Sequence, residues 1–178
     1  MIVVGLLAAA ERGSDLASAI ARRAASEGAR VEILGVQPWG AVGDEILLDL
    51  TAAGVGHATV ARSEAPTLDR EDLDLALRYL PDVRVIVLAR PSEELLGVAA
   101  AASGWTGAAL IVIQQRDDAL PDETALAGVE PIAIEAPSSD PDGAFAGLVA
   151  SLAARIERGE PAGDAWRSTL AALAVDPA

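Results

Sequence analysis

The feature that most constrains the fold is a regular alternation of short apolar runs with helical patterns. The clearest run, Val83–Ala89, is apolar at every position except Arg84. Continuous apolar runs of this length are typical of strands that are buried on both faces of a parallel sheet. Six runs predict a sheet of about six strands, and they cover Ile2–Ala8, Arg30–Val36, Gly56–Ala61, Val83–Ala89, Ala108–Gln114 and Val129–Glu135.

Helical patterns separate most of these runs. Asp69, Ser92 and Asp140 are side chains that favour the N-cap position, and Pro141 suits the first helical position. Alternating strands and helices form βαβ units with right-handed crossovers. We therefore expect one domain over residues 1–178, a three-layer α/β sandwich whose mostly parallel sheet carries helices on both faces. The predicted helices span residues 15–27, 43–53, 69–80, 92–103, 140–158 and 163–174.

Charge and composition narrow the classes of partner. The formal net charge of −14 argues against nucleic acid and against an anionic membrane surface, both of which need a basic face. No apolar run approaches the ~20 residues of a membrane span. The chain has no cysteine, and no basic segment precedes its first apolar run, so we expect a cytoplasmic protein without disulfides.

Missing residue types exclude several kinds of chemistry. The chain has no lysine, which excludes a Walker lysine and a Schiff-base lysine. Its single histidine, His57, cannot form a histidine-rich metal site. The adjacent carboxylates Asp117 and Asp118 are a weak metal pair within the polar stretch that begins at Gln114, so no metal is expected.

The stretch Pro137–Gly147 opens a helix with an apolar face. The N-terminus of a helix attracts anions through free N–H groups and the positive end of its dipole. Here Asp140 and Asp142 place their own carboxylates at that end. A phosphate group would meet like charge, and the alternative interpretation is a capped helix of the core.

Three blocks of the chain resemble the ribokinase-like (PfkB) carbohydrate kinases. Gly13–Gly35 resembles their first helix and second strand, and Gly35–Val55 resembles the segment that ends in Leu-x-x-x-Gly-Val. Pro137–Gly147, followed by Arg158-Gly159-Glu160, resembles their C-terminal helix pair. The resemblance implies the ribokinase-like fold in a shortened form without the lid. It also implies descent from enzymes that phosphorylate sugars or nucleosides with ATP and Mg²⁺.

The working residues of the family do not carry over. Its Gly-Ala-Gly-Asp turn falls on residues 140–143, so Asp140 and Asp142 replace both anion-hole glycines and Gly143 replaces the catalytic base. Its aspartate pair before the second helix falls on Trp39 and Gly40. Asp142, one residue from the base position, is the one weak catalytic candidate.

We therefore expect a non-catalytic domain that binds a small molecule or associates with itself, without a cofactor. The predicted ligand-binding residues are Trp39, Gly40, Ser139, Asp140 and Gly143. One alternative is an active sugar or nucleoside kinase with a rearranged site, which would need ATP and Mg²⁺. The other is a structural interaction subunit without a ligand.

A homodimer is also expected. A shortened chain should expose a sheet edge or apolar surface that longer relatives cover, and such surfaces are usually paired. Trp39, Trp105 and Trp166 are the aromatic candidates for the contact.

Overall fold

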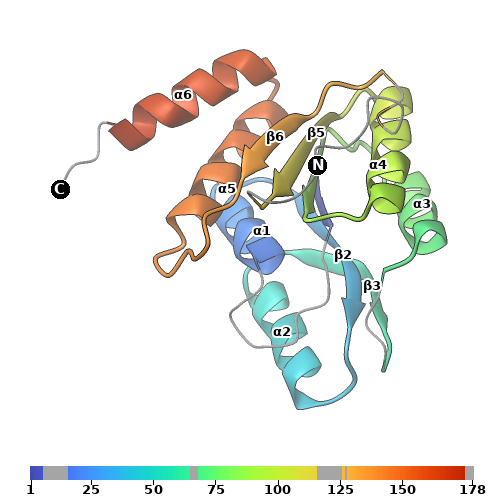
Figure 1. The fold of residues 1–178 in the computed structure, drawn as a ribbon. Coiled ribbons are helices and arrows are strands. Elements are labelled where there is room, and N and C mark those ends of the chain that lie inside the picture. Colours follow the sequence, from blue (N-terminus) through green and yellow to red (C-terminus); the bar gives the residue numbers. More distant parts are fainter. Residues whose placement is uncertain (6–15, 65–67, 116–125, 127, 175–178) are drawn as a thin grey trace.

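A six-stranded parallel sheet forms the centre of the molecule (Figure 1). The computed structural model describes residues 1–5, 16–64, 68–115, 126 and 128–174. The strand order is β3-β2-β1-β4-β5-β6, and every neighbouring pair runs parallel. The predicted fold class is thereby confirmed. The strands are β1 (Ile2–Gly5), β2 (Val31–Gln37), β3 (Gly56–Arg62), β4 (Val85–Ala89), β5 (Ala109–Gln114) and β6 (Ile132–Glu135).

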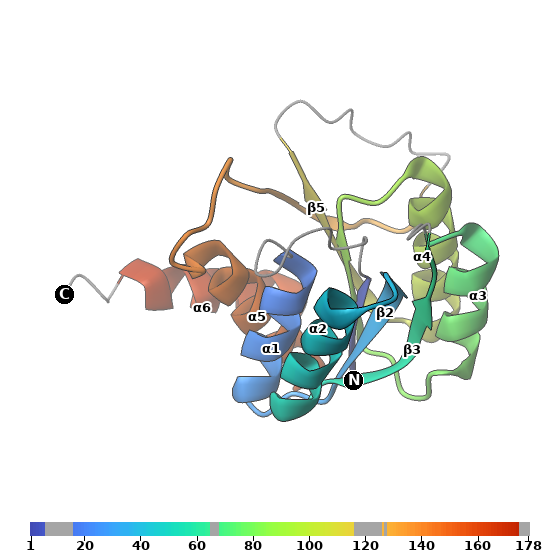
Figure 2. The same cartoon turned by 90° about the horizontal axis from the view of Figure 1, so that it is seen from below.

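Helices cover both faces of the sheet (Figure 2). One face carries α1, α2 and α5, with α6 packed on α5, and the other face carries α3 and α4. The arrangement is the three-layer sandwich that alternating strands and helices predict. The helices are α1 (Leu16–Ser26), α2 (Ala41–Ala52), α3 (Arg70–Tyr79), α4 (Glu93–Thr106), α5 (Ala144–Glu157) and α6 (Ala162–Ala174).

The four inner strands, β1, β2, β4 and β5, supply side chains to two separate cores. In β4, Val85 and Val87 pack beneath α1 and α5, whereas Ile86 and Leu88 pack beneath α3 and α4. All four are at most 4% exposed. Because side chains alternate between the faces of a strand, burial on both faces requires a continuous apolar run. The run Val83–Ala89 was the clearest in the sequence for this reason.

Several boundaries differ from the sequence prediction. Helix α2 begins at Ala41 rather than Gly43, and β6 begins at Ile132 rather than Val129. The prediction that Asp140 is the N-cap of α5 is wrong, because the helix begins at Ala144 and Gly143 is its N-cap. Gly143 has a φ of 66°, so the chain makes a left-handed turn after Asp140 before the helix starts.

Successive strands are added on one side of β1 up to β3, and from β4 onward they are added on the other side. The chain runs outward through β2 to β3, and then reverses to place β4 on the other side of β1. In such doubly wound sheets, ligands bind outside the carboxyl ends of the strands at this reversal. The site search therefore begins there. None of the described helices is long and apolar enough to cross a membrane.

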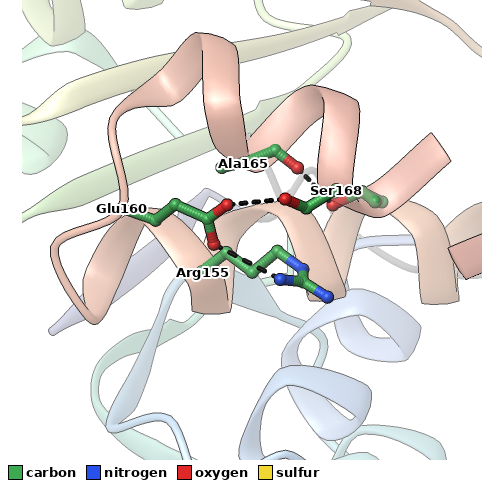
Figure 3. Close-up of polar contacts among 5 residues, drawn as sticks. Arg155, Glu160, Ala165 and Ser168 are labelled. Atoms are coloured by element: carbon green, nitrogen blue, oxygen red, sulfur yellow. Dashed lines mark hydrogen bonds and ion pairs between the residues drawn. The ribbon is translucent and has the colours of Figure 1, made fainter. Parts of the chain in front are cut away.

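The far end of α5 is joined to α6 by a polar cluster (Figure 3). Glu160, between the two helices, accepts a hydrogen bond from Ser168 Oγ at 2.8 Å and pairs with Arg155 Nη1 at 3.3 Å. The bond from Ser168 and the charge of Arg155 hold the pKa of Glu160 below its ordinary value. These contacts fix α6 against α5 at the edge remote from the reversal point.

Candidate functional site at the carboxyl ends of the strands

A cavity of about 410 Å³ lies at the carboxyl ends of β4, β5 and β6. It is bordered by the first turns of α1 and α5, so it sits at the reversal point of the sheet. Its volume falls within the range of small-molecule pockets, ≈ 300–1,000 Å³. The lining residues are Leu16, Ala19, Arg90, Gln115, Ala136, Pro137, Ser139, Asp140, Pro141, Gly143 and Phe145.

The carboxylate of Asp140 occupies the N-terminus of α5. Its Oδ1 accepts a hydrogen bond from the Phe145 N–H at 3.0 Å, and its Oδ2 accepts one from the Ala146 N–H at 2.9 Å. Both amides belong to the first turn, where a helix has no internal partner for its N–H groups. An external anion would need these donors. The side chain of Asp140 therefore stands where a bound phosphate would stand.

Gly143 and Arg23 shape the turn before α5. The Gly143 N–H donates to the Asp140 carbonyl at 3.1 Å, which closes a tight loop over residues 140–143. Arg23, from α1, donates from Nη2 to the Asp142 carbonyl at 3.1 Å. A Cβ at Gly143 would lie 2.5 Å from Arg23 Nη2. The left-handed φ and this close approach both favour glycine here.

Comparison with solved structures addresses the fold. No family model matches the chain, and no curated protein matches it. The crystal structure of Sa239 aligns at 12% identity with a TM-score of 0.68, over 99% of this chain and 94% of that chain. Aminoimidazole riboside kinase from Salmonella enterica aligns at 12% identity with a TM-score of 0.60, over 95% and 88%. Halothermothrix orenii fructokinase aligns at 11% identity with a TM-score of 0.61, over 99% of both chains.

The chain has the ribokinase-like fold. At these identities the likeness is one of fold, and it agrees with the fold that the three sequence blocks implied. The two places where the resemblance implies missing lengths are the connection after β1 and the segment before β6. They involve residues 6–15 and 116–125, which lie outside the described residues.

The ribokinase-like fold brings three of the predicted ligand-binding residues together. Ser139, Asp140 and Gly143 all line the cavity. Trp39 and Gly40 are not among its lining residues, because they lie on the loop between β2 and α2. The sequence predicts that all five residues bind a ligand. The structure places them in two separate regions. The weak catalytic candidate, Asp142, is exposed beside the cavity and meets Arg23 through its backbone carbonyl.

The loop between β2 and α2 does not border this cavity, and its Trp39 contacts Arg62 of β3. Trp39 is 65% exposed, and the guanidinium carbon of Arg62 lies 5.3 Å from the centroid of its ring. Arg62 also pairs with Asp44 in the first turn of α2. Cation–π stacking and an ion pair together place the Arg62 guanidinium across the start of the helix. Arg62 of β3 thus links Trp39 of the loop to Asp44 of α2, while the tryptophan ring remains exposed.

One buried side chain in this region has no partner. Gln37, the last residue of β2, is 0% exposed, and neither its Oε1 nor its Nε2 has a hydrogen-bond partner among the described residues. It is in register with Arg62, whose Nη1 is also buried without a partner. An unpaired buried polar group costs roughly 1–3 kcal/mol. Within the described part of the chain, the side-chain atoms of Gln37 and the Nη1 of Arg62 are therefore buried polar atoms without a partner.

Sequence reasoning missed the lining residues outside the two stretches. Arg90 directly follows β4, and Leu16 and Ala19 lie in the first turns of α1. Gln115 belongs to the polar stretch after β5, which the sequence offered as a possible site for a polar ligand, with a solvated loop as the preferred interpretation. Their place in the sequence directly after a strand could have identified Arg90 and Gln115, because residues that follow central strands meet at the carboxyl edge of a parallel sheet.

Two other possible sites carry less chemistry. Among the residues described, no group of three carboxylate or histidine side chains could hold a metal ion. The pair Asp117 and Asp118 lies outside the described residues. A larger groove of about 820 Å³ between α3 and α4 is lined by charged side chains such as Asp74 and Arg78, which pair at 2.9 Å. This groove lies between two helices, away from the strand ends.

Proposed function

We propose that the protein is a degenerate ribokinase-like domain that binds a small polar molecule without phosphorylating it. The cavity at the reversal point is the binding site. The solved structures that resemble this protein in fold include a kinase complexed with aminoimidazole riboside and an ATP analogue, and a fructokinase. A sugar or a nucleoside is therefore the class of ligand that the fold favours.

The observation that carries the proposal is the carboxylate of Asp140 on the α5 amides. Phosphoryl transfer depends on positioning and on donors that stabilise charge on the phosphoryl oxygens. Here the Phe145 and Ala146 amides are already bonded to a carboxylate at 3.0 and 2.9 Å. The site offers negative charge where the reaction needs hydrogen-bond donors.

The remaining residues do not fit Mg-ATP either. The chain lacks lysine, and Gly143 stands at the position that the family resemblance gives to the base. Within the described ranges no carboxylate cluster could hold the metal. We therefore propose no step through ATP or magnesium, and the active-kinase alternative has no support in the geometry of the cavity.

The test combines a binding screen with an activity assay. Thermal unfolding is followed with a panel of sugars and nucleosides, since a ligand that binds only the folded state raises the melting temperature. The same panel is incubated with Mg-ATP, and no turnover is expected. Turnover that is abolished by Asp142→Ala would contradict the proposal.

Two neighbouring serines provide matched variants for the screen. Ser139 lines the cavity and is exposed, whereas Ser138 is exposed but is not a lining residue. We expect Ser139→Trp to fill the cavity and abolish the ligand-dependent shift, and Ser138→Trp to retain it. Equal shifts in both variants would place the ligand elsewhere.

We also propose self-association, which exposed aromatic surface favours. Trp39 and Trp105 are 65% and 58% exposed, whereas Trp166 is partly buried against the core. The three tryptophans do not form one surface, because α2 and α4 cover opposite faces of the sheet. Trp39 lies close in sequence to two further exposed side chains of α2, Val42 and Leu48, so we favour this side for contact with a second copy.

Light scattering at micromolar concentration tests the association. A dimer is expected, and Trp39→Ser is expected to reduce it to a monomer. Trp105→Ser removes an aromatic side chain of similar exposure from the other face and should leave the dimer intact. A monomeric mass for the unmodified protein at every concentration would contradict the proposal.

A further inference from the structure

Arg90 adopts a backbone conformation that is unusual for its residue type. Its φ is 57°, in the left-handed region. Among the described residues other than glycine, Asp82 alone shares a positive φ, at 56°. Aspartate tolerates this region because its short side chain can bond locally, whereas arginine has no such compensation. Strained residues of this kind persist where the surrounding structure holds them and often mark functional sites.

The strain at Arg90 is held by the neighbouring strand. The Arg90 N–H donates to the carbonyl of Ile113 in β5 at 2.8 Å. This bond continues the pairing of β4 with β5 by one residue, to the carboxyl edge of the sheet. The chain then turns towards Ser92, the N-cap of α4. The turn places Arg90 in the lining of the cavity at the reversal point.

Arg90 lines the cavity, and among the described residues its guanidinium has no partner. No acceptor in the described parts of the chain forms a hydrogen bond or ion pair with it, and the residue is exposed. Asp140 also lines the cavity, but each of its carboxylate oxygens already accepts a backbone amide of α5. Both oxygens of this carboxylate are therefore hydrogen-bonded to the start of α5.

We propose that Arg90 binds an oxyanion on the ligand, so that the cavity takes a sugar phosphate or a sugar acid in preference to a neutral sugar. The inference rests on the proposed function and specifies the ligand of the same site. Arginine presents a planar fork of donors that matches phosphate and carboxylate. The apolar lining, including Leu16 and Phe145, provides a wall for the carbon skeleton.

Because the protein as a whole is acidic, a preference for anionic ligands would indicate a local cation in the cavity. At a net charge of −14, the protein repels anions at long range. Tighter binding of an anion than of its neutral counterpart must then come from close contact with a local cation. The same charge predicts that added salt weakens the binding little or strengthens it, because salt screens the repulsion.

The experiment compares matched ligands by calorimetry. The neutral members are ribose and fructose, and the charged members are ribose 5-phosphate, fructose 6-phosphate and ribonate, with inorganic phosphate measured alone. For at least one pair we expect the charged member to bind about 10-fold or more tightly than the neutral one, as is typical of a charge-assisted contact. Ribonate and ribose 5-phosphate distinguish a carboxylate from a phosphate. Arg90→Gln should bring the preference to about 1, while the affinity for the neutral sugar changes by less than about 2-fold.

Glycine variants at the two left-handed positions provide an independent measurement. Arg90→Gly removes the strain and the guanidinium together, so it should raise the melting temperature by about 2–4 °C and abolish the preference for anions. Asp82→Gly relieves the same φ at the opposite end of β4 and should leave ligand binding unchanged.

The outcomes separate the two proposals. If neutral sugars bind and the charged members bind no better, or if Arg90→Gln keeps the preference, the assignment of Arg90 is wrong and the proposed function stands. If no member of the panel binds and Ser139→Trp changes nothing, the proposed function fails and the assignment fails with it.

Discussion

The starts of α2 and α5 are built alike and yet present different surfaces. Each helix begins after a glycine N-cap of positive φ, 104° at Gly40 and 66° at Gly143, and neither glycine offers a side-chain cap. Each start is approached by an arginine from another element, Arg62 from β3 and Arg23 from α1. Both stretches were candidate sites in the sequence.

The two starts differ in what meets the first turn. At α5, Asp140 reaches across the loop to two amides, and the turn borders an open cavity. At α2, Arg62 pairs with Asp44 and stacks on Trp39, and Gln37 is buried behind them without a partner. At the α5 start the first-turn amides are hydrogen-bonded and a cavity remains open beside them. At the α2 start Arg62 packs on Trp39, and the buried side-chain atoms of Gln37 have no partner among the described residues.

This difference shows that a helix start at the carboxyl edge is not by itself a binding site. The described cavity borders the α5 start, where residues that follow three strands surround the turn. Three substitutions, each with a matched control, test this contrast between the two helix starts.

Gly43→Ala should cause the largest loss of stability. A Cβ at this position would lie 2.2 Å from the Pro38 carbonyl oxygen, which is backbone and cannot move aside cheaply. We expect a loss of about 3 kcal/mol in urea unfolding, as for overpacked sites. Gly147→Ala is the matched control at the α5 start, because its Cβ would meet only Arg23 side-chain atoms at 3.6 Å or more. That variant should gain about 0.5–1 kcal/mol from helix propensity. Equal stability of both variants would show that the α2 start is not closely packed.

Asp140→Ala should cost about 1–2 kcal/mol, since the substitution removes the acceptor of two first-turn amides. The measurement is again urea unfolding at neutral pH. Asp142→Ala, two residues away, should stay within about 0.5 kcal/mol because the contact of Asp142 with Arg23 uses its backbone carbonyl. If the two variants lose the same stability, Asp140 does not cap α5 in solution.

Gln37→Met should raise stability by about 1 kcal/mol, because the substitution removes two buried polar atoms that have no partner. Methionine has a similar length and volume, so packing should be kept. Gln114→Met is the control at the end of β5, where the residue is only half-buried. A loss of stability in Gln37→Met alone would reveal a bonded amide and would remove the contrast between the two starts.

The sequence predicted the layers of the fold because burial on both faces leaves a local signature. Val85–Ala89 must be apolar throughout, since its alternate residues enter different cores. The sequence also identified Asp140 as the residue that occupies the start of α5. It placed the helix start too early, because a left-handed turn at Gly143 precedes the helix.

The amino-acid sequence by itself determined the parallel three-layer architecture, since that architecture follows from residue types at local spacing. Only the tertiary structure decided which loops share a site. Strand order places β4 between β1 and β5, and so brings Arg90 to Ser139 and Asp140 in one cavity. The same order places the loop after β2 beyond β1, apart from them. Strand order is set by how whole helices cover the sheet, and no stretch of sequence carries that information alone.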